Sequence, residues 1–208
     1  MTNDINSDLI EYVEQRIIPR YAAFDSAHRE DHARAVIERA LELSAHYDVD
    51  INIVYAAAAC HDLGLAVDRK THHLESGRII RSDATLAGIL GPEGLEAAAC
   101  AAEDHRASSE TAPRSIYGRI VAEADRLIEP LTIIRRTVQY GLDHYPDLDK
   151  EGHWQRTLEH LKEKYGDGGY LKLWIPLSSN AARLEELRKI IRDEERLKRI
   201  FEKIWDSF

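Results

Sequence analysis

The chain contains one almost uninterrupted apolar run, INIVYAAAAC, at residues 51–60. The helical period that dominates the sequence continues through this run, and it predicts a helix over residues 51–62. A helix that is apolar on nearly all sides belongs in the middle of a bundle, because it has no polar face to expose to solvent. The sequence therefore predicts an all-α protein built around this segment.

Helical periodicity also divides the rest of the chain into segments. The other predicted helices carry apolar residues at helical spacing and cover residues 7–19, 30–47, 74–90, 93–103, 116–124, 131–142 and 147–164. A last, long helix is predicted over residues 178–205, with one apolar and one charged face; it either packs back on the bundle or forms a dimer interface. Only YLKLWI, at residues 170–175, has extended character.

Composition and charge narrow the classes of function. The apolar fraction of 44% is that of an ordinary globular protein. The formal net charge is −9, and there is no long run of lysine or arginine, so binding to duplex nucleic acid is not expected. A small anionic substrate remains compatible with this charge, because a metal ion and a few basic groups can reverse the potential inside one pocket.

The cysteines and the N-terminus favour a cytoplasmic protein. Cys60 and Cys100 lie in alanine-rich runs, which predicts free core thiols rather than a disulfide and fits a reducing cytosol. The first residues, MTNDINSDLIEYVEQ, lack the basic and apolar regions of a signal peptide. No window approaches the ~20 apolar residues that a membrane span needs.

Histidine is concentrated in one half of the chain, where seven of the ten histidines lie between residues 28 and 105. The adjacent pair His61-Asp62 stands at the end of the apolar helix. Burying an imidazole and a carboxylate there costs free energy unless a partner satisfies them. A divalent cation would do so, because neutral imidazole and ionised carboxylate are both good ligands for such ions.

Two further segments place metal-competent side chains on helices. His28-x-x-x-His32 puts two histidines on one helix face upstream. Downstream, Asp125 interrupts the apolar face of IVAEADRL, and a carboxylate in that position is not buried without a partner.

In order and rough spacing, His32, His61-Asp62 and Asp125 resemble the HD-domain metal-dependent phosphohydrolases. That family has one histidine, then an adjacent His-Asp, then a distant aspartate, all on helices, and the surrounding segments HREDH, HDLG and AEADR are similar too. The resemblance covers residues 25–130 and is strongest to small stand-alone hydrolases. It implies an HD-like helical core at about 25–130 and a C-terminal helical extension at about 131–208, within one domain at 1–208.

The resemblance also implies an activity. One divalent cation (Mn, Fe, Co, Ni or Mg) would be held by His32, His61, Asp62 and Asp125. A water activated by the ion would attack the phosphorus of a small phosphorylated substrate, such as a nucleotide. Asp62 is the group predicted to orient or deprotonate this water.

Other residues are candidates for the same pocket. His73 and His105 are predicted to bind a second metal ion or the substrate phosphate, with His105 also a catalytic candidate. Asp104, rather than a second histidine, precedes His105, so the sequence leaves open whether the centre holds one ion or two. The basic side chains of Arg69, Lys70 and Arg106 are candidates for binding phosphate.

The remaining histidines lie outside the set of four predicted metal ligands. For His28 the sequence leaves open a metal ligand, a helix cap or a group that supports the ligands from behind; the last is preferred, and His28 is also a candidate for contacting substrate. His72 is expected to be an exposed loop residue. The predicted surface histidines are His46, His144, His153 and His160.

Three other functions stay open. The same fold could sense a nucleotide as a regulatory module without turnover. The helix at 178–205 could make this an interaction protein, for instance a homodimer. A two-iron oxygenase is a further reading, against which the missing second histidine near residue 105 counts.

Overall fold

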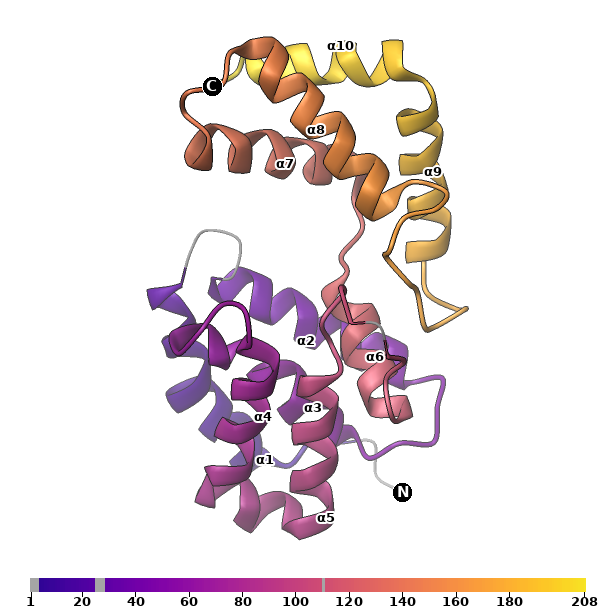
Figure 1. The fold of residues 1–208 in the computed structure, drawn as a ribbon. Helices are drawn as coiled ribbons and strands as arrows, with labels where there is room; N and C mark the ends of the chain where they lie inside the picture. The colour runs from indigo at the N-terminus through magenta and orange to yellow at the C-terminus, as the bar shows by residue number, and fades with distance from the viewer. Residues whose placement is uncertain (1–3, 25–28, 110) are drawn as a thin grey trace. The chain divides into compact units, whose positions relative to one another are not determined.

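The computed structural model describes residues 4–24, 29–109 and 111–208. Within these ranges the regular structure is helical and contains no strand (Figure 1). The predicted all-α fold class is therefore confirmed. No helix in the described ranges has both the length and the apolar character needed to cross a membrane.

The chain divides into two compact units. The first holds the described residues up to Leu127 together with Trp174–Ser178, and the second holds Ile128–Leu173 and Ser179–Phe208. The boundary at residues 127 and 128 lies close to the predicted start of the C-terminal extension. That residues 1–208 form a single domain stays a prediction.

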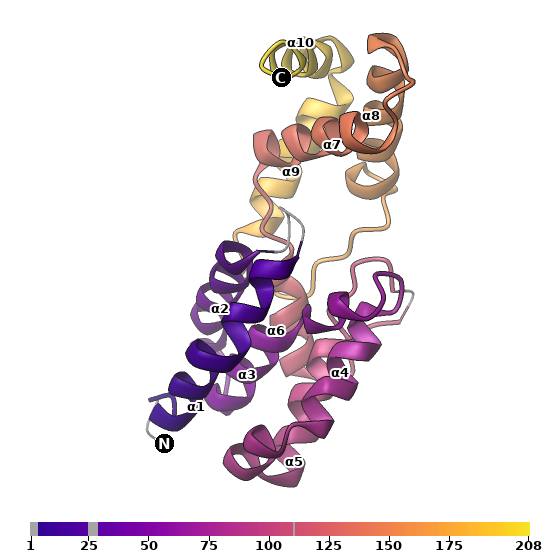
Figure 2. The same cartoon turned by 90° about the vertical axis from the view of Figure 1, so that its left-hand side faces the viewer.

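The first unit is organised around α3. Every residue of this helix from Ile53 to Cys60 is buried, and α3 lies among α2, α5 and α6, as its apolar composition predicts (Figures 1 and 2). The elements of this unit are α1 (Ser7–Tyr12), η1 (Val13–Ile17), η2 (Ile18–Ala23), α2 (Glu30–Ser44), α3 (Ile51–Cys60), η3 (Leu63–Ala66), α4 (His72–Ser82), α5 (Ala84–Glu103) and α6 (Ile116–Asp125).

The predicted single helix over residues 74–90 is wrong, because the chain breaks at Asp83. This residue is extended (φ −84°, ψ 105°), and its side chain accepts hydrogen bonds from the backbone amides of Thr85 and Leu86. It thereby satisfies two amides that a new helix leaves without partners. The predicted break at Gly91-Pro92 is present as a kink inside α5, where Gly91 adopts a φ of 68° that favours glycine.

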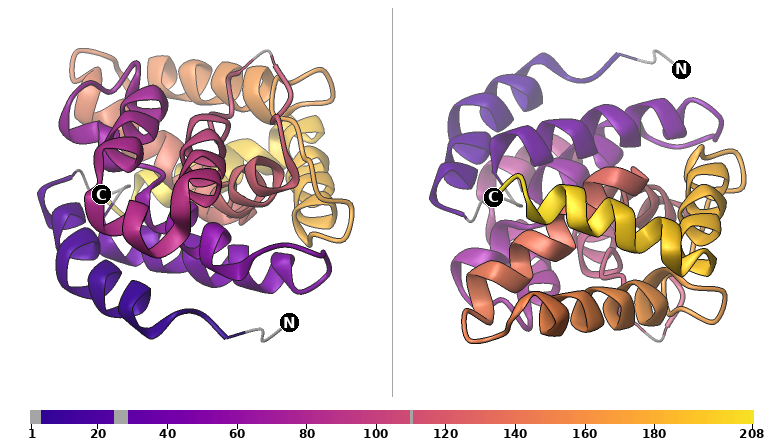
Figure 3. Two further views of the ribbon diagram at one scale, coloured as in Figure 1. Left: turned by 90° about the horizontal axis from the view of Figure 1, so that it is seen from below. Right: turned by 90° about the horizontal axis from the view of Figure 1, so that it is seen from above.

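The second unit consists of α7 (Pro130–His144), α8 (Lys150–Tyr165), α9 (Asn180–Arg192) and α10 (Glu194–Trp205). The predicted continuous helix over residues 178–205 is wrong, because it is interrupted at Asp193 (φ −93°, ψ 82°), which caps α10 through the amide of Arg196. The right-hand view of Figure 3 shows α10 in yellow, and it packs on α7 and α9. Its apolar residues Leu197, Phe201 and Ile204 are buried.

Residues 170–175 form neither helix nor strand. The backbone amides of Trp174 and Ile175 donate hydrogen bonds of 2.7 Å and 3.3 Å to Oε2 of Glu123, a fully buried carboxylate on α6. This contact attaches the Trp174–Ser178 segment to the first unit. Both cysteines are free thiols, as predicted, but only Cys60 lies in the core, and Cys100 is partly buried.

Candidate metal centre

Six metal-competent side chains converge inside the first unit. They come from helices far apart in the sequence and comprise His32 (α2), His61 and Asp62 (between α3 and η3), His72 (α4), His105 (after α5) and Asp125 (α6). His61 is fully buried, and Asp62 and His105 are each 3% exposed. Such burial of ionisable groups needs partners, which these residues provide for one another.

The backbone after α3 explains why η3 and α4 come close. The helix ends at Cys60, so His61 and Asp62 occupy the turn that leads into η3. The amide of Gly64 donates to Ser76 Oγ at 2.9 Å, and a Cβ atom at Gly64 would collide with the backbone carbonyl of His72. Glycine at this position therefore permits the close approach that brings His72 to Asp62.

Asp62 stands at the middle of the cluster. Its Oδ2 atom lies 3.2 Å from His61 Nε2 and 3.6 Å from His32 Nε2. Its Oδ1 atom lies 3.5 Å from His105 Nε2 and 3.6 Å from His72 Nε2. Each oxygen of one carboxylate thus faces a different pair of histidines.

Asp125 joins the Oδ2 side of this arrangement. Its Oδ1 atom lies 3.2 Å from His32 Nε2 and 3.8 Å from His61 Nε2. The Asp125 side chain is 23% exposed, compared with 4% for that of Asp62. The structure therefore brings together all four residues predicted from the sequence, and the Asp125 edge of the group is accessible to solvent.

The Oδ1 side contains a histidine that sequence reasoning missed. Ligand atoms of Asp62, His72 and His105 lie within 4.8 Å of one another, and the Nε2 atoms of the two histidines are 3.2 Å apart. The expectation of an exposed loop residue at His72 is wrong, because it is the first residue of α4 and its side chain is 17% exposed. Its position next to His73 was the signal, but the sequence analysis selected only His73 of that pair.

His73 does not share the Asp62-facing position of His72. Its ring centroid lies 5.6 Å from that of His72, and its buried Nδ1 atom has no hydrogen-bond partner within the described ranges. Burial, and next the charge of Arg106, lower the pKa of His73 to about 4. A role for His73 in contacting substrate stays a prediction.

Three of the histidines are oriented by the same local hydrogen bond. Nδ1 pairs with the carbonyl oxygen three residues earlier in His61 (Ala58, 2.8 Å), His72 (Arg69, 2.8 Å) and His105 (Ala102, 2.5 Å). Because a carbonyl only accepts, each Nδ1 carries a proton, and Nε2 is the ring atom that faces the centre and can bind a cation when the ring is neutral. Hydrogen bonds of this kind commonly orient histidine ligands of metal ions.

The electrostatics of the centre fit a bound cation. Burial opposes ionisation of Asp62, but His61, His105 and His32 hold its pKa well below the usual range. Burial likewise opposes charge on His32, yet Asp125 and Asp62 raise its pKa to about 10. Nε2 of His61 is buried without a hydrogen-bond partner in the described part of the chain. Two carboxylates beside ring nitrogens make a donor set suited to divalent ions, which would displace the protons from the rings on binding.

The predicted phosphate-binding residues differ in their surroundings. Arg69 and Lys70 are exposed in the turn between η3 and α4. The guanidinium of Arg106 is already engaged, since Nη1 donates to the backbone carbonyl of Lys70 and Nε donates to Ser108 Oγ at 3.0 Å. His28 lies outside the described residues.

Among the predicted surface histidines, His46 and His144 are exposed. The prediction for His153 is wrong, because its side chain is buried in the second unit against the Trp205 ring, with centroids 5.1 Å apart. His160 is partly buried, and burial lowers its pKa.

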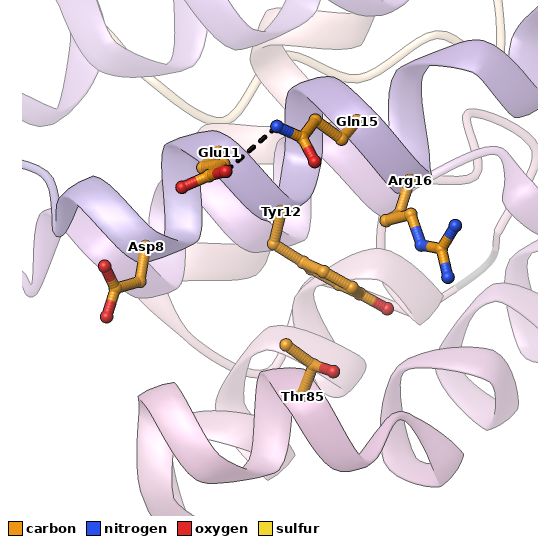
Figure 4. A pocket seen from close by; sticks show the side chains of 6 residues that line it. All are labelled: Asp8, Glu11, Tyr12, Gln15, Arg16 and Thr85. Atoms are coloured by element: carbon orange, nitrogen blue, oxygen red, sulfur yellow. Dashed lines mark hydrogen bonds between the residues drawn. The ribbon is translucent and has the colours of Figure 1, made fainter.

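A cavity of about 470 Å³ lies elsewhere in the first unit (Figure 4). The hydroxyl of Tyr12 at its wall donates to Asp83 Oδ2 at 2.5 Å, and burial followed by this contact raises the Tyr12 pKa to about 12. Its lining contains no histidine, so it lacks the donor set of the metal centre. The lining residues are Asp8, Glu11, Tyr12, Gln15, Arg16 and Thr85.

Comparison with known families places the centre in context. The family model described as HD domain matches residues 29–129, a range that contains all six residues of the cluster. Proteins with this domain are generally metal-dependent hydrolases. Comparisons with curated proteins and with solved structures gave no significant match. The HD-domain match at residues 29–129 and the helical His/Asp centre inside it together support an HD-domain superfamily protein.

Proposed function

We propose that this protein is a metal-dependent phosphohydrolase that acts on a small phosphorylated substrate. One observation carries the proposal: the two oxygens of the buried Asp62 carboxylate each face a pair of histidine nitrogens. A carboxylate in this position can bridge two cations. The HD domain, whose members are generally metal-dependent hydrolases, supports the same function.

The donor groups suggest which residues would hold each of two ions. His32, His61 and Asp125 would hold one ion on the Oδ2 side of Asp62. His72 and His105 would hold a second on the Oδ1 side. Mixed nitrogen and oxygen ligands suit Mn, Fe, Co, Ni or Mg, and the set contains no cysteine of the kind found in structural zinc sites.

The chain's own residues have separable roles in this mechanism. A divalent ion, when bound, supplies positive charge to the phosphoryl oxygens and lowers the pKa of a coordinated water. Asp62 directs both oxygens at histidines, so we assign it a ligand role rather than that of a base. Asp125, the more exposed carboxylate, would orient the attacking water. The side chains of Arg69 and Lys70 would hold the substrate phosphate at the surface turn.

His105 has a ligand role in this scheme rather than that of a proton donor. Its Nδ1 atom is occupied by the Ala102 carbonyl, and its Nε2 atom faces Asp62 and His72. Both nitrogens thus contact groups within the centre.

The test combines metal analysis with activity. The purified protein is assayed against a panel of phosphorylated metabolites with Mn²⁺, Mg²⁺, Co²⁺ or Ni²⁺ added in turn. We expect phosphate release that is lost in His61→Ala and Asp62→Ala and retained in the control His46→Ala, which alters an exposed histidine. Phosphate release equal to that of the parent in both ligand variants would sink the proposal. Thermal stabilisation by a nucleotide without turnover would instead favour the regulatory module.

One observation favours the alternative function of a two-iron oxygenase, namely that His72 lies beside His105. The objection from the sequence was that His105 has no paired histidine, and His72 fills that place in space. Oxygen uptake by the iron-loaded protein with the same panel would support an oxygenase. Phosphate release with Mg²⁺, which has no redox chemistry, would contradict it.

A further inference from the structure

The three hydrogen bonds that orient histidines differ in what holds the accepting carbonyl. Ala58 lies inside α3 and Ala102 inside α5, so their carbonyls are fixed by regular helical structure. The carbonyl that orients His72 belongs to Arg69, which lies in the turn between η3 and α4. The direction of His72 Nε2 therefore depends on the conformation of this turn.

The Asp68 side chain stabilises the turn between η3 and α4 by hydrogen bonds to other residues of the same turn. Its carboxylate accepts the backbone amides of Lys70 and Thr71, both at 3.2 Å, and the hydroxyl of Thr71 at 2.7 Å. These bonds hold the backbone amides of Lys70 and Thr71, the two residues between Arg69 and His72.

Arg106, from the segment after α5, stabilises the same turn by a hydrogen bond to its backbone. Nη1 of Arg106 donates to the backbone carbonyl of Lys70, and Nε donates to Ser108 Oγ. Arg106 directly follows His105, so the segment that supplies His105 also holds the turn that orients His72. The two histidines that face Asp62 Oδ1 are thus tied together through one guanidinium.

We propose that Asp68 and Arg106 are positioning residues that set the affinity of a second ion at Asp62, His72 and His105. This rests on the two-ion centre of the proposed function. The first ion position takes His32, His61 and Asp125 from helices or a helix end and does not use the turn. Disturbing the turn therefore weakens the second position and spares the first.

The sign of the Arg106 effect separates positioning from simple electrostatics. Removing a positive charge close to a cation site strengthens cation binding by Coulomb's law. Removing the hydrogen bond that holds the turn weakens binding, and loss of groups that orient a ligand typically costs about 10–100-fold in metal affinity. Only the positioning role predicts weaker binding in Arg106→Ala.

The experiment titrates the metal-free, full-length protein with Mn²⁺ alone by calorimetry. We expect two binding events, of which the weaker loses about 10–100-fold in affinity in both Arg106→Ala and Asp68→Ala. Arg106→Lys should recover part of this loss, because lysine can still donate to the Lys70 carbonyl. The control Arg78→Ala removes a charge from the exposed face of α4, where Arg78 pairs with Glu75, and should bind as the parent does.

The outcomes distinguish this inference from the proposed function. Fewer than two Mn²⁺ ions in the parent protein would overturn both the two-ion centre and the positioning role. Two ions in the parent, with equal or tighter second binding in Arg106→Ala, would overturn the positioning role alone. Equal weakening of both ions, in a variant with parental circular dichroism, would also overturn it, because the turn would then act on the whole centre.

Discussion

Each of the two units contains a buried histidine, but the groups around the two histidines differ. His61 in the first unit is fully buried and lies 3.2 Å from the Asp62 carboxylate. His153 in the second unit is 2% exposed and packs against the Trp205 ring and the backbone of Gly141. Its Nδ1 atom has no hydrogen-bond partner within the described ranges. Burial of a histidine therefore does not define a metal centre by itself, and the converging carboxylate makes the difference.

The largest expected effect comes from removing the Asp62 carboxylate, which distinguishes the surroundings of His61 from those of His153. Asp62→Ala should abolish binding of both ions and lower kcat/KM by more than about 100-fold, because it removes the group shared by all four facing histidines. Mass spectrometric metal analysis and phosphate-release kinetics would measure this. Retention of either ion by Asp62→Ala would contradict the shared-ligand role, while His153→Ala should keep the parental metal content.

A smaller effect should separate the two adjacent histidines of α4. His72→Ala is expected to lower the Mn²⁺ content from two ions to one, because His72 Nε2 faces Asp62 Oδ1. His73→Ala should keep both ions, since His73 is not among the residues grouped around Asp62. Metal content after gel filtration is the measurement, and the reverse order of effects would show that α4 presents His73 instead.

His153 should matter for stability alone. His153→Ala leaves a cavity beside Trp205 and is expected to lower the free energy of unfolding by about 1–3 kcal/mol. Urea denaturation followed by tryptophan fluorescence would report the change. A loss of bound metal in this variant, without unfolding, would remove the distinction between the two buried histidines.

The smallest effect concerns the charges that join α4 to α5. Arg81 donates to both carboxylate oxygens of Glu96, at 2.7 Å and 2.8 Å, and lowers the Glu96 pKa to about 2. Because the folded-state pKa is depressed, this stabilisation is present above the ordinary value of 4.5 and is lost as the pH falls towards 2. The pair is largely exposed, so Glu96→Gln should cost less than about 1 kcal/mol at pH 7.

The pH dependence provides the check on this pair. Urea denaturation at pH 7 and at pH 3 should give a smaller difference between the parent and Glu96→Gln at the lower pH. A difference that grows on acidification would contradict the depressed pKa of Glu96.

Much of the candidate site could be predicted because its signals are local. His61-Asp62 follows an apolar helix, and Asp125 interrupts an otherwise apolar helix face, so the cost of burying these groups is visible in a single segment. The long apolar run likewise predicts a central helix, and α3 is buried accordingly. Helix ends were less predictable, because Asp83 and Asp193 interrupt segments whose apolar spacing continues on both sides.

The sequence by itself predicted the all-α class and the central helix from the polarity of its segments, and the four residues His32, His61, Asp62 and Asp125 from their resemblance to the HD-domain pattern. Only the tertiary structure decided between His72 and His73. Side chains of adjacent helical residues point about 100° apart, so the choice depends on how the start of α4 is rotated. The approach of α4 to Gly64, a contact between segments, and the local hydrogen bond that His72 Nδ1 donates to the Arg69 carbonyl set that rotation.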